Sequence, residues 1–314
     1  MDFSIIIINY NLSNEVKNCI NSIIQFIDNS NFEIILVDNN SHDKSVLKLV
    51  DALNQNSRLK FLFIQMDKNI GFGNACNLAA KKSSGNWLLF LNPDTLIKDN
   101  IFQRMKYELN GNFINKGIIG LNVNCNKLMD FSAGFFPNYI LEVFNIFLLG
   151  RYLEAIFVRI ISKFSRTKKI RVEWVMGAAL FINRYLFEEI KGFDQDYFLF
   201  FEEMDLCKRV INKGFPVTYL ANIKISHLGG ASAKRNYYFL TKMFYKGKLL
   251  FLKKHSSKSA FDIYKIILFF TIINQIIFWL LNKLNNKEKA LGKIKAFREI
   301  LKNLSTPEEI TNLS

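Results

Sequence analysis

Short apolar, β-branched runs alternate with helix-like segments at the start of the chain, and this alternation is what most constrains the fold. Four runs have the length and composition of strands: residues 4–8, 32–37, 59–64 and 87–91. Apolar residues at helical spacing lie between the first two, from Val16 to Ile27, and residues 73–82 predict a further helix. Strands that alternate with helices predict a parallel α/β sheet.

Polar residues follow these runs directly, at Asn9 and Asn11, Asp38 to Asn40, Asn69, and Asn92 to Asp94. The runs themselves are almost continuously apolar, which predicts strands that are buried on both faces of the sheet. In such sheets ligands bind beyond the carboxyl ends of the strands. The sequence therefore predicts a binding site at this one edge.

Two segments place carboxylates where they could act. Asp94 lies in a turn after a buried strand, and a divalent cation on phosphate oxygens needs only one or two protein carboxylates. The alternative is a turn whose aspartate caps a helix.

In residues 192–209, a series of aromatic residues is followed by the acidic residues Glu202, Glu203 and Asp205. A carboxylate beside aromatic walls has a raised proton affinity and can serve as a general base, whereas acids in a first helical turn can also simply complement the helix dipole.

A third segment, residues 225–232, ends a predicted strand at His227 and continues into a glycine-rich loop. Neutral imidazole is a good ligand for ions such as Mn²⁺. The alternative is a structural histidine, which is the commoner case at a strand end.

The charge of the chain is strongly basic and unevenly distributed. It has 42 Lys and Arg against 27 Asp and Glu, a formal charge of +15, and residues 233–304 alone carry +13 of it. Such a balance predicts an anionic partner: a nucleic acid, a membrane surface or a phosphorylated substrate.

The four cysteines are far apart in the sequence, which argues against a zinc site or a disulfide framework and favours a reducing, cytosolic environment. The N-terminus lacks the basic region of a signal peptide.

The basic region surrounds an apolar stretch of sixteen residues, Ile266 to Leu281, in which only three residues are polar. A full span needs about 20 residues, and basic residues flank the stretch on both sides. We therefore expect residues 256–314 to be a helical tail that lies on a membrane surface, with residues 1–255 as a separate domain. A helix buried against the domain is the alternative. Nucleic acid is disfavoured, because the basic residues flank an apolar helix instead of being interleaved with exposed aromatic residues.

Taken in order, the motifs resemble those of family 2 glycosyltransferases, in particular the rhamnosyltransferase-like branch that builds bacterial surface polysaccharides. The resemblance spans about residues 4–255 and is carried by residues 5–11, 37–41, 69–77, 91–95, 174–179, 192–209 and 227–232. It implies the GT-A nucleotide-diphospho-sugar transferase fold, an α/β fold with a Rossmann-like, mostly parallel sheet, here followed by the helical, membrane-associating tail.

The resemblance also implies roles for the donor-side residues. Asp38 would read the pyrimidine ring, and Asn69 and Asn77 would lie on the ribose-diphosphate side. The full nucleotide-sugar set is Asn9, Asn11, Asp38, Asn40, Asn69, Gly71, Asn77 and Asn92. Asp94 matches the last acid of the family's D-x-D element and, with His227, would hold Mg²⁺ or Mn²⁺. Asn92 stands where the element usually has its first acid, which leaves one carboxylate fewer.

On the acceptor side, Glu203 matches the catalytic base, a position where the family usually has aspartate. Asp205 would orient this base, Glu202 would complete the catalytic group, and Trp174, Gly177 and Ala178 would shape the acceptor site. The implied reaction is inverting: an acceptor hydroxyl attacks the anomeric carbon opposite the departing nucleoside diphosphate.

The resemblance predicts transfer of rhamnose from dTDP-rhamnose to a lipid-linked oligosaccharide in O-antigen, capsule or cell-wall polysaccharide synthesis. The enzyme would work at the cytoplasmic face of the inner (plasma) membrane, as a peripheral or monotopic protein. Two alternatives remain open: a UDP-hexose or UDP-N-acetylhexosamine donor, and a non-catalytic sugar-binding or assembly subunit, which only the departures at Asn92 and Glu203 favour.

Overall fold

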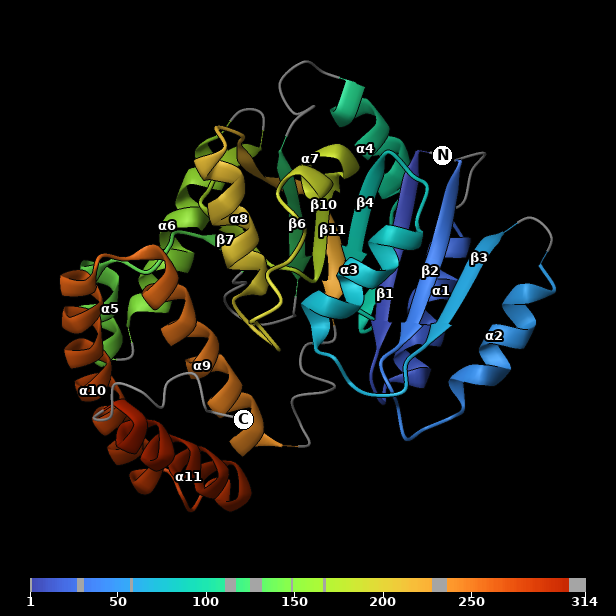
Figure 1. Ribbon diagram of the computed structural model, residues 1–314. Helices are drawn as coiled ribbons and strands as arrows, with labels where there is room; N and C mark the ends of the chain where they lie inside the picture. The colour runs from blue at the N-terminus through green and yellow to red at the C-terminus, as the bar shows by residue number, and fades with distance from the viewer. Residues whose placement is uncertain are drawn as a thin grey trace.

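A computed structural model describes residues 2–26, 31–56, 59–110, 117–124, 132–147, 149–165, 168–227 and 236–304. Within these residues the main sheet has nine strands, in the order β3-β2-β1-β4-β10-β6-β11-β5, with β8 paired to β11. A second, two-stranded sheet consists of β7 and β9. Figure 1 shows the main sheet at the centre of the molecule, with the C-terminal helices beyond the end that lies opposite β3.

The first half of the sheet confirms the alternation predicted from the sequence. Its strands are all parallel: β1 (Phe3–Asn9), β2 (Phe32–Asp38), β3 (Lys60–Gln65) and β4 (Trp87–Leu91). Between them lie α1 (Ser13–Ile24), α2 (Val46–Asn54) and α3 (Phe72–Lys82). Every residue of β1 and β2 is buried, as continuous apolar strands require. The carboxyl ends of these strands therefore meet at one edge.

The second half is mixed. The strand β10 (Ala179–Asn183) lies antiparallel between β4 and β6 (Ile118–Asn124). The strand β11 (Val217–His227) runs parallel to β6, and β5 (Thr95–Leu96) and β8 (Lys169–Arg171) pair with it antiparallel. The sequence has two strand-like runs here, at residues 215–220 and 223–226, but they belong to one strand with a shift of register between Leu220 and Lys224.

Residues 172–182 read in the sequence as one apolar, strand-like run, but the structure divides them between the two sheets. β9 (Trp174–Val175) leaves the main sheet and pairs with β7 (Ala133–Gly134). Gly120 of β6 makes this crossing possible: a Cβ atom there would lie 2.3 Å from Cβ of Val175. Val175 therefore packs directly on the backbone of the main sheet, and the chain returns to that sheet as β10.

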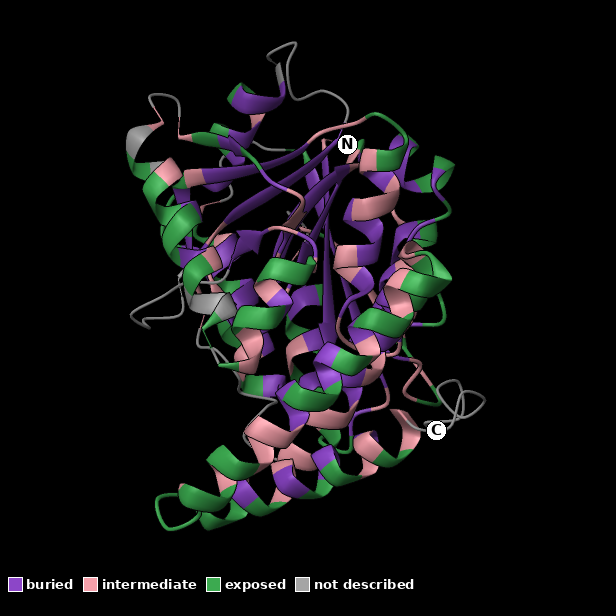
Figure 2. Cartoon of the chain, turned by 90° about the vertical axis from the view of Figure 1, so that its left-hand side faces the viewer, coloured by how far each residue is buried: buried purple, intermediate pink, exposed green. Residues whose placement is uncertain are grey.

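The other helices are α4 (Ile101–Asn110), α5 (Tyr139–Ile146), α6 (Gly150–Phe164), α7 (Arg184–Glu189), α8 (Glu202–Asn212), α9 (Tyr237–His255), α10 (Lys258–Leu281) and α11 (Lys287–Leu304). The last three share a separate apolar core that includes Leu249, Leu268 and Phe297. The helix α10 has 24 residues, longer than the sixteen-residue apolar stretch within it. Figure 2 shows the side of the molecule on which α5, α6 and α10 lie, with exposed residues along the helices.

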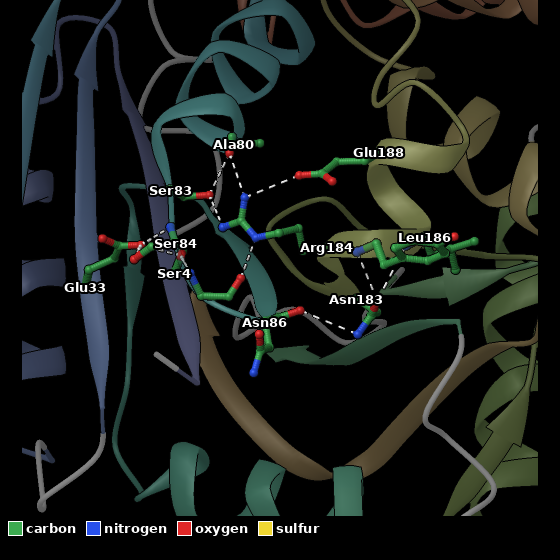
Figure 3. A network of polar contacts seen from close by, with 12 residues as sticks. Ser4, Glu33, Ala80, Ser83, Ser84, Asn86, Asn183, Arg184, Leu186 and Glu188 are labelled. Atoms are coloured by element: carbon green, nitrogen blue, oxygen red, sulfur yellow. Dashed lines mark hydrogen bonds and ion pairs between the residues drawn. The ribbon is translucent and has the colours of Figure 1, made fainter.

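A polar network fastens the opposite edge of the sheet, at the amino end of β4 (Figure 3). The guanidinium of Arg184 donates to the carbonyl oxygens of Gly85 at 2.7 Å and Ala80 at 3.2 Å, and to Oγ of Ser83 at 2.7 Å. An open cavity of about 380 Å³ borders Arg184 and Trp87. This cavity lies at the amino ends of the strands, away from the predicted site.

Candidate active site

Asp38 lies at the carboxyl end of β2 and is completely buried. Its Oδ1 accepts a hydrogen bond from Nδ2 of Asn9 at 2.8 Å. Its Oδ2 accepts from Nε2 of Gln65 at 3.0 Å and from the backbone N–H of Ser41 at 3.3 Å. Asp38 thus ties together the ends of β1, β2 and β3 and the loop after β2. The structure brings Asn9 and Asp38 together, as the sequence predicts.

The loops around Asp38 have backbone conformations that few residues adopt. Asn11 and Asn40 have φ values of 58° and 62°, in the left-handed region where asparagine is enriched. The Asn11 side chain accepts hydrogen bonds from the backbone N–H groups of His42 and Asp43. The β1 and β2 loops are therefore joined at the edge where the nucleotide-binding residues are expected.

Asn69 and Gly71 lie in the loop before α3, next to Asn39. Oδ1 of Asn69 accepts from Nδ2 of Asn39 and from the backbone N–H of Gly71, both at 2.9 Å. Asn77, on α3, has a different environment: its amide donates to the carbonyl oxygen of Phe193 and accepts from the N–H of Phe193, both at 2.8 Å. In the structure Asn77 thus fastens the loop before α8 to α3.

Asp94 and His227 meet where β5 pairs with β11. Nε2 of His227 lies 2.9 Å from Oδ1 of Asp94, and both side chains are largely buried. Asn92 to Thr95 form a tight turn in which the N–H and the hydroxyl of Thr95 both donate to the carbonyl oxygen of Asn92. The turn expected from the sequence is present, and the two residues that the resemblance gives as metal ligands lie in contact although they are 133 positions apart.

This pair has the chemistry of a partial divalent-cation site. One carboxylate and one imidazole suit Mn²⁺, and Mg²⁺ commonly takes one or two carboxylates together with substrate phosphates. Among the described residues no group of three or more His, Cys, Asp and Glu side chains could hold a metal ion. Asp94 and His227 thus fit a cation whose other ligands come from a bound diphosphate or from water.

Glu203 lies in the first turn of α8, against the turn that follows β9. A Cβ atom on Gly177 would lie 3.5 Å from Cβ and 3.9 Å from Cδ of Glu203, so the two residues face each other. Oε2 of Glu203 is buried and has no hydrogen-bond partner within the described residues. Burial raises the pKa of this carboxyl above its usual value, although hydrogen bonds to backbone groups, including Gly177, oppose the shift. Such a carboxylate is a strong proton acceptor.

Glu202 and Asp205 lie on the same turn of α8 but in other surroundings. Glu202 is buried near Gly73 of α3, and burial together with the charge of Glu203 raises its pKa well above the usual value. Asp205 accepts from Nε of Arg209 at 2.7 Å and contacts Nε2 of His255 at 2.7 Å. These contacts direct Asp205 toward Arg209 and α9, and the expected contact with Glu203 is not among them.

The predicted acceptor-side residues surround the same turn. The carbonyl oxygen of Ala178 accepts from the N–H of Asn92, which joins this turn to the Asp94 turn. Nε1 of Trp174 donates to the carbonyl oxygen of Phe135 at 3.0 Å and to Oε1 of Glu154 at 3.2 Å. The indole therefore connects the smaller sheet to α6. The glycine-rich loop predicted after His227 lies outside the described residues.

Sequence reasoning missed two contributors to these networks. Gln65, at the end of β3, bonds Asp38, and its position after a strand-like run was an available signal. His255 bonds Asp205 from α9, fifty residues away, and no local pattern indicates that contact.

Comparison with known proteins shows which proteins this chain is similar to. Residues 4–116 match the family model Glycosyl transferase family 2. The chain is 26% identical over 223 residues to rhamnosyltransferase WbbL of Escherichia coli (strain K12), across 62% of this chain and 82% of that protein. It is also 31% identical over 65 residues to N-acetylglucosaminyl-diphospho-decaprenol L-rhamnosyltransferase of Mycobacterium tuberculosis (strain H37Rv), across 21% of each chain.

Among solved structures, the chain resembles a mannosyltransferase, PcManGT, from Pyrobaculum calidifontis in complex with GDP-Man and Mn²⁺. The TM-score is 0.58 at 12% identity, over 99% of this chain and 85% of that one. At this identity the likeness concerns the fold alone. Residues 4–116 thus match the model of family 2 glycosyltransferases, the longer alignment is to a rhamnosyltransferase, and the fold is that of solved GT-A glycosyltransferases.

Proposed function

We propose that this protein is an inverting glycosyltransferase in which Glu203 is the catalytic base. The observation that carries the proposal is the Glu203 carboxyl itself: the residue is half-buried, its Oε2 is buried without a partner in the described part of the chain, its pKa is raised, and Gly177 faces it. Oε2 of Glu202 is also buried without a hydrogen-bond partner in the described part of the chain, but Glu202 lies against Gly73 of α3, whereas Glu203 faces the turn at Gly177. Buried carboxylate oxygens without a partner are uncommon, and proton-transfer sites are one place where they occur. The arrangement also favours an enzyme over a non-catalytic subunit.

The step that follows is a single displacement. The acceptor hydroxyl oxygen forms a bond to the anomeric carbon, while the bond from that carbon to the diphosphate oxygen breaks. Glu203 accepts the hydroxyl proton as the bond forms, which avoids a charged, poorly stabilised oxonium. Glu202 lies beside Glu203 on the side of α3. Asp205 helps to fix the first turn of α8 through its contacts with Arg209 and His255.

On the donor side, Asp38 and Asn9 organise the edge where the nucleotide binds, together with Asn11, Asn40, Asn69, Gly71 and Asn92. Asp94 and His227 would hold Mg²⁺ or Mn²⁺, and such an ion supplies stabilisation of the charge that develops on the leaving diphosphate. Asn77 supports this side indirectly, because it anchors the loop at Phe193.

The donor that we propose is dTDP-rhamnose. Two relatives support it, because both are rhamnosyltransferases, and one of them is named for an N-acetylglucosaminyl-diphospho-decaprenol. The decaprenol-linked acceptor in the name of this second relative also supports a lipid-linked acceptor and a role in surface polysaccharide synthesis for this protein. A UDP-hexose or UDP-N-acetylhexosamine donor remains the alternative within the same chemistry.

A lipid-linked acceptor calls for a membrane, and α10 offers the surface for it. In the part of the chain that the structure describes, this is the one helix long and apolar enough to cross a membrane, and about a fifth of its most apolar window is buried. One side of α10 packs on the catalytic domain: the hydroxyl of Tyr264 donates to the carbonyl oxygen of Pro137, and its ring stacks on Tyr139. The other side exposes Ile266 and Phe270.

The neighbouring helices extend this exposed face. Ile140 of α5 and Phe147, which directly follows α5, are 71% and 65% exposed, and Phe157 of α6 is 52% exposed. A helix that is fastened along one side to its own domain suits a place in the membrane interface better than a span, and lysines on either side suit anionic headgroups. We therefore propose a monotopic protein at the cytoplasmic face, where its buried, free cysteines Cys19, Cys76 and Cys207 stay reduced.

A donor screen tests the function. Purified protein in detergent is given dTDP-rhamnose or UDP-sugars, with a lipid-linked acceptor, and release of the nucleoside diphosphate is followed with Mn²⁺ or with a chelator. Selective, metal-dependent release from dTDP-rhamnose supports the proposal. Selective turnover of a UDP-sugar keeps the mechanism and rejects rhamnose, and binding without turnover of any donor favours the non-catalytic subunit.

Vesicle flotation tests the membrane surface. Phe147→Ser removes an exposed ring directly after α5, and Phe270→Ser removes one from α10. Each should weaken binding to vesicles that contain anionic lipid by about tenfold or more, since burying a Phe side chain is worth ~1.5–3 kcal/mol. Leu47→Ser on α2, which is also an exposed apolar residue, is the matched control. Unchanged flotation of both phenylalanine variants contradicts this surface.

A further inference from the structure

The C-terminal end of α9 contacts the segment that carries the proposed base. Nζ of Lys254 lies 2.6 Å from Oδ2 of Asp194 and 2.6 Å from Oδ2 of Asp196. The next residue, His255, places Nε2 2.7 Å from Oδ1 of Asp205, whose side chain is 1% exposed. Two consecutive residues of α9 therefore hold the loop before α8 and the first turn of α8.

Between these contacts the segment contains two consecutive phenylalanines with left-handed backbone, Phe200 at φ 68° and Phe201 at φ 71°. Bulky residues rarely adopt this region, and each such residue costs about 1–3 kcal/mol. A turn of this kind persists only where its surroundings hold it. Glu202 and then Glu203 follow this turn directly, so the position of the base depends on the conformation of the turn.

The helix α9 also supports the turn along its length. It passes so close that a Cβ atom on Gly247 would lie 2.5 Å from the carbonyl oxygen of Phe200. The rings of Phe244 and Phe251 lie 5.3 and 6.0 Å from the ring of Phe201. Backbone contact, ring packing and the two polar contacts at its end thus come from one helix.

We propose that His255, assisted by Lys254, is a positioning residue for the catalytic carboxylate: through Asp205 it fixes the start of α8 and the strained turn before Glu203. The inference rests on the function proposed for Glu203. His255 acts through another side chain. Since α9 leads directly into α10, the helix that supports the base is joined to the helix that we propose lies on the membrane.

Three full-length variants test the inference. His255→Leu removes the contact with Asp205 and keeps an apolar side chain against Phe251, whereas His255→Gln keeps an N–H donor. Lys242→Gln is the matched control, because its 2.8 Å ion pair joins the same helix to Glu299 on α11. We expect the leucine variant to lose at least tenfold in kcat with donor KM within threefold, the glutamine variant to recover most of kcat, and the control to match the wild type.

Hydrogen exchange gives a readout that needs no turnover. The amides of residues 194–205 should exchange at least tenfold faster in His255→Leu than in the wild type, and at the wild-type rate in Lys242→Gln. Wild-type exchange and wild-type kcat in the leucine variant overturn the proposal, and so does an equal loss in the control. If exchange responds as expected but the wild type transfers no sugar, the support of α8 by His255 stands and the proposed function fails.

Discussion

Replacing Glu203 by Gln separates catalysis from folding, and the structure sets the size of both effects. Glutamine has nearly the same shape and keeps a carbonyl oxygen that can accept from the backbone of Gly177. Oε2 has no partner to lose. The change in hydrogen bonding should therefore be within ~1 kcal/mol, a shift of about 2–4 °C in Tm at most.

The effect on the reaction should be far larger. Glutamine cannot accept the proton of the acceptor hydroxyl, and a positioned general base contributes ~10²–10⁴-fold. At 1.36 kcal/mol for each factor of ten, this corresponds to about 2.7–5.4 kcal/mol of lost transition-state stabilisation. Release of the nucleoside diphosphate with acceptor present measures it, and Glu188→Gln on α7, an exposed glutamate, is the matched control.

The pH dependence of stability gives a second, independent test of the raised pKa values. Burial raises the pKa of Glu203 and of Glu202, so in the folded protein both carboxyls bind protons more tightly than in the unfolded chain. Their favourable contribution is complete below the usual pKa of 4.5 and is lost as the pH rises through the higher folded values. Tm of the wild type should therefore fall from pH 5 to pH 8, and that of Glu203→Gln should fall less.

The raised pKa of Glu203 also places the acidic limb of the pH–rate profile above the usual range of a glutamate, because activity needs the deprotonated base. The residual activity of Glu203→Gln should lack this limb. Turnover of the variant within threefold of the wild type, or a pH limb that survives the substitution, would refute the assignment of the base.

Three further substitutions test other parts of the structure. Asp94→Asn should reduce metal-dependent turnover at least 100-fold in the same release assay, with Asp99→Asn as a control that leaves it unchanged, since Asp99 is largely exposed. Lys248→Met leaves Glu142 buried and unpaired and should lower the free energy of unfolding by ~3–5 kcal/mol in denaturant titration, whereas Lys248→Met combined with Glu142→Leu should be nearly neutral. Gly120→Ala should lower the free energy of unfolding by ~1–3 kcal/mol in the same titration, because its methyl group would overlap the buried side chain of Val175 on β9.

The first half of the fold could be predicted because its signals are local. Strands buried on both faces, such as β1 and β2, are continuous apolar runs, and the polar residues after them fall at the edge where ligands bind. The contact between Asp94 and His227 could be inferred only through the resemblance, since nothing in either segment indicates its partner. The split at residues 172–182 was hidden, because it depends on the missing side chain of Gly120 on another strand.

The individual roles of polar residues were harder to predict than their location. Asp38 lies where a base-reading acid was expected, yet its two oxygens accept from Asn9, Gln65 and Ser41. Asn77 lies on the expected helix, yet its amide is bonded to backbone. A sequence motif preserves a residue type at a position, but whether that residue meets the ligand or holds the loop beside it depends on neighbours from several strands.

The turn before Glu203 shows where local rules fail and why. Nothing in the residue type of Phe200 and Phe201 favours left-handed backbone, and a sequence-based prediction would extend α8 backward or place a strand there. Natural chains break local preferences mainly at functional sites, and compensate through contacts elsewhere. Here the compensation comes from α9, through Gly247, Phe251 and His255. A variant that loosens α9 should therefore impair catalysis before it unfolds the sheet, and this order of events distinguishes a positioning helix from a passive tail.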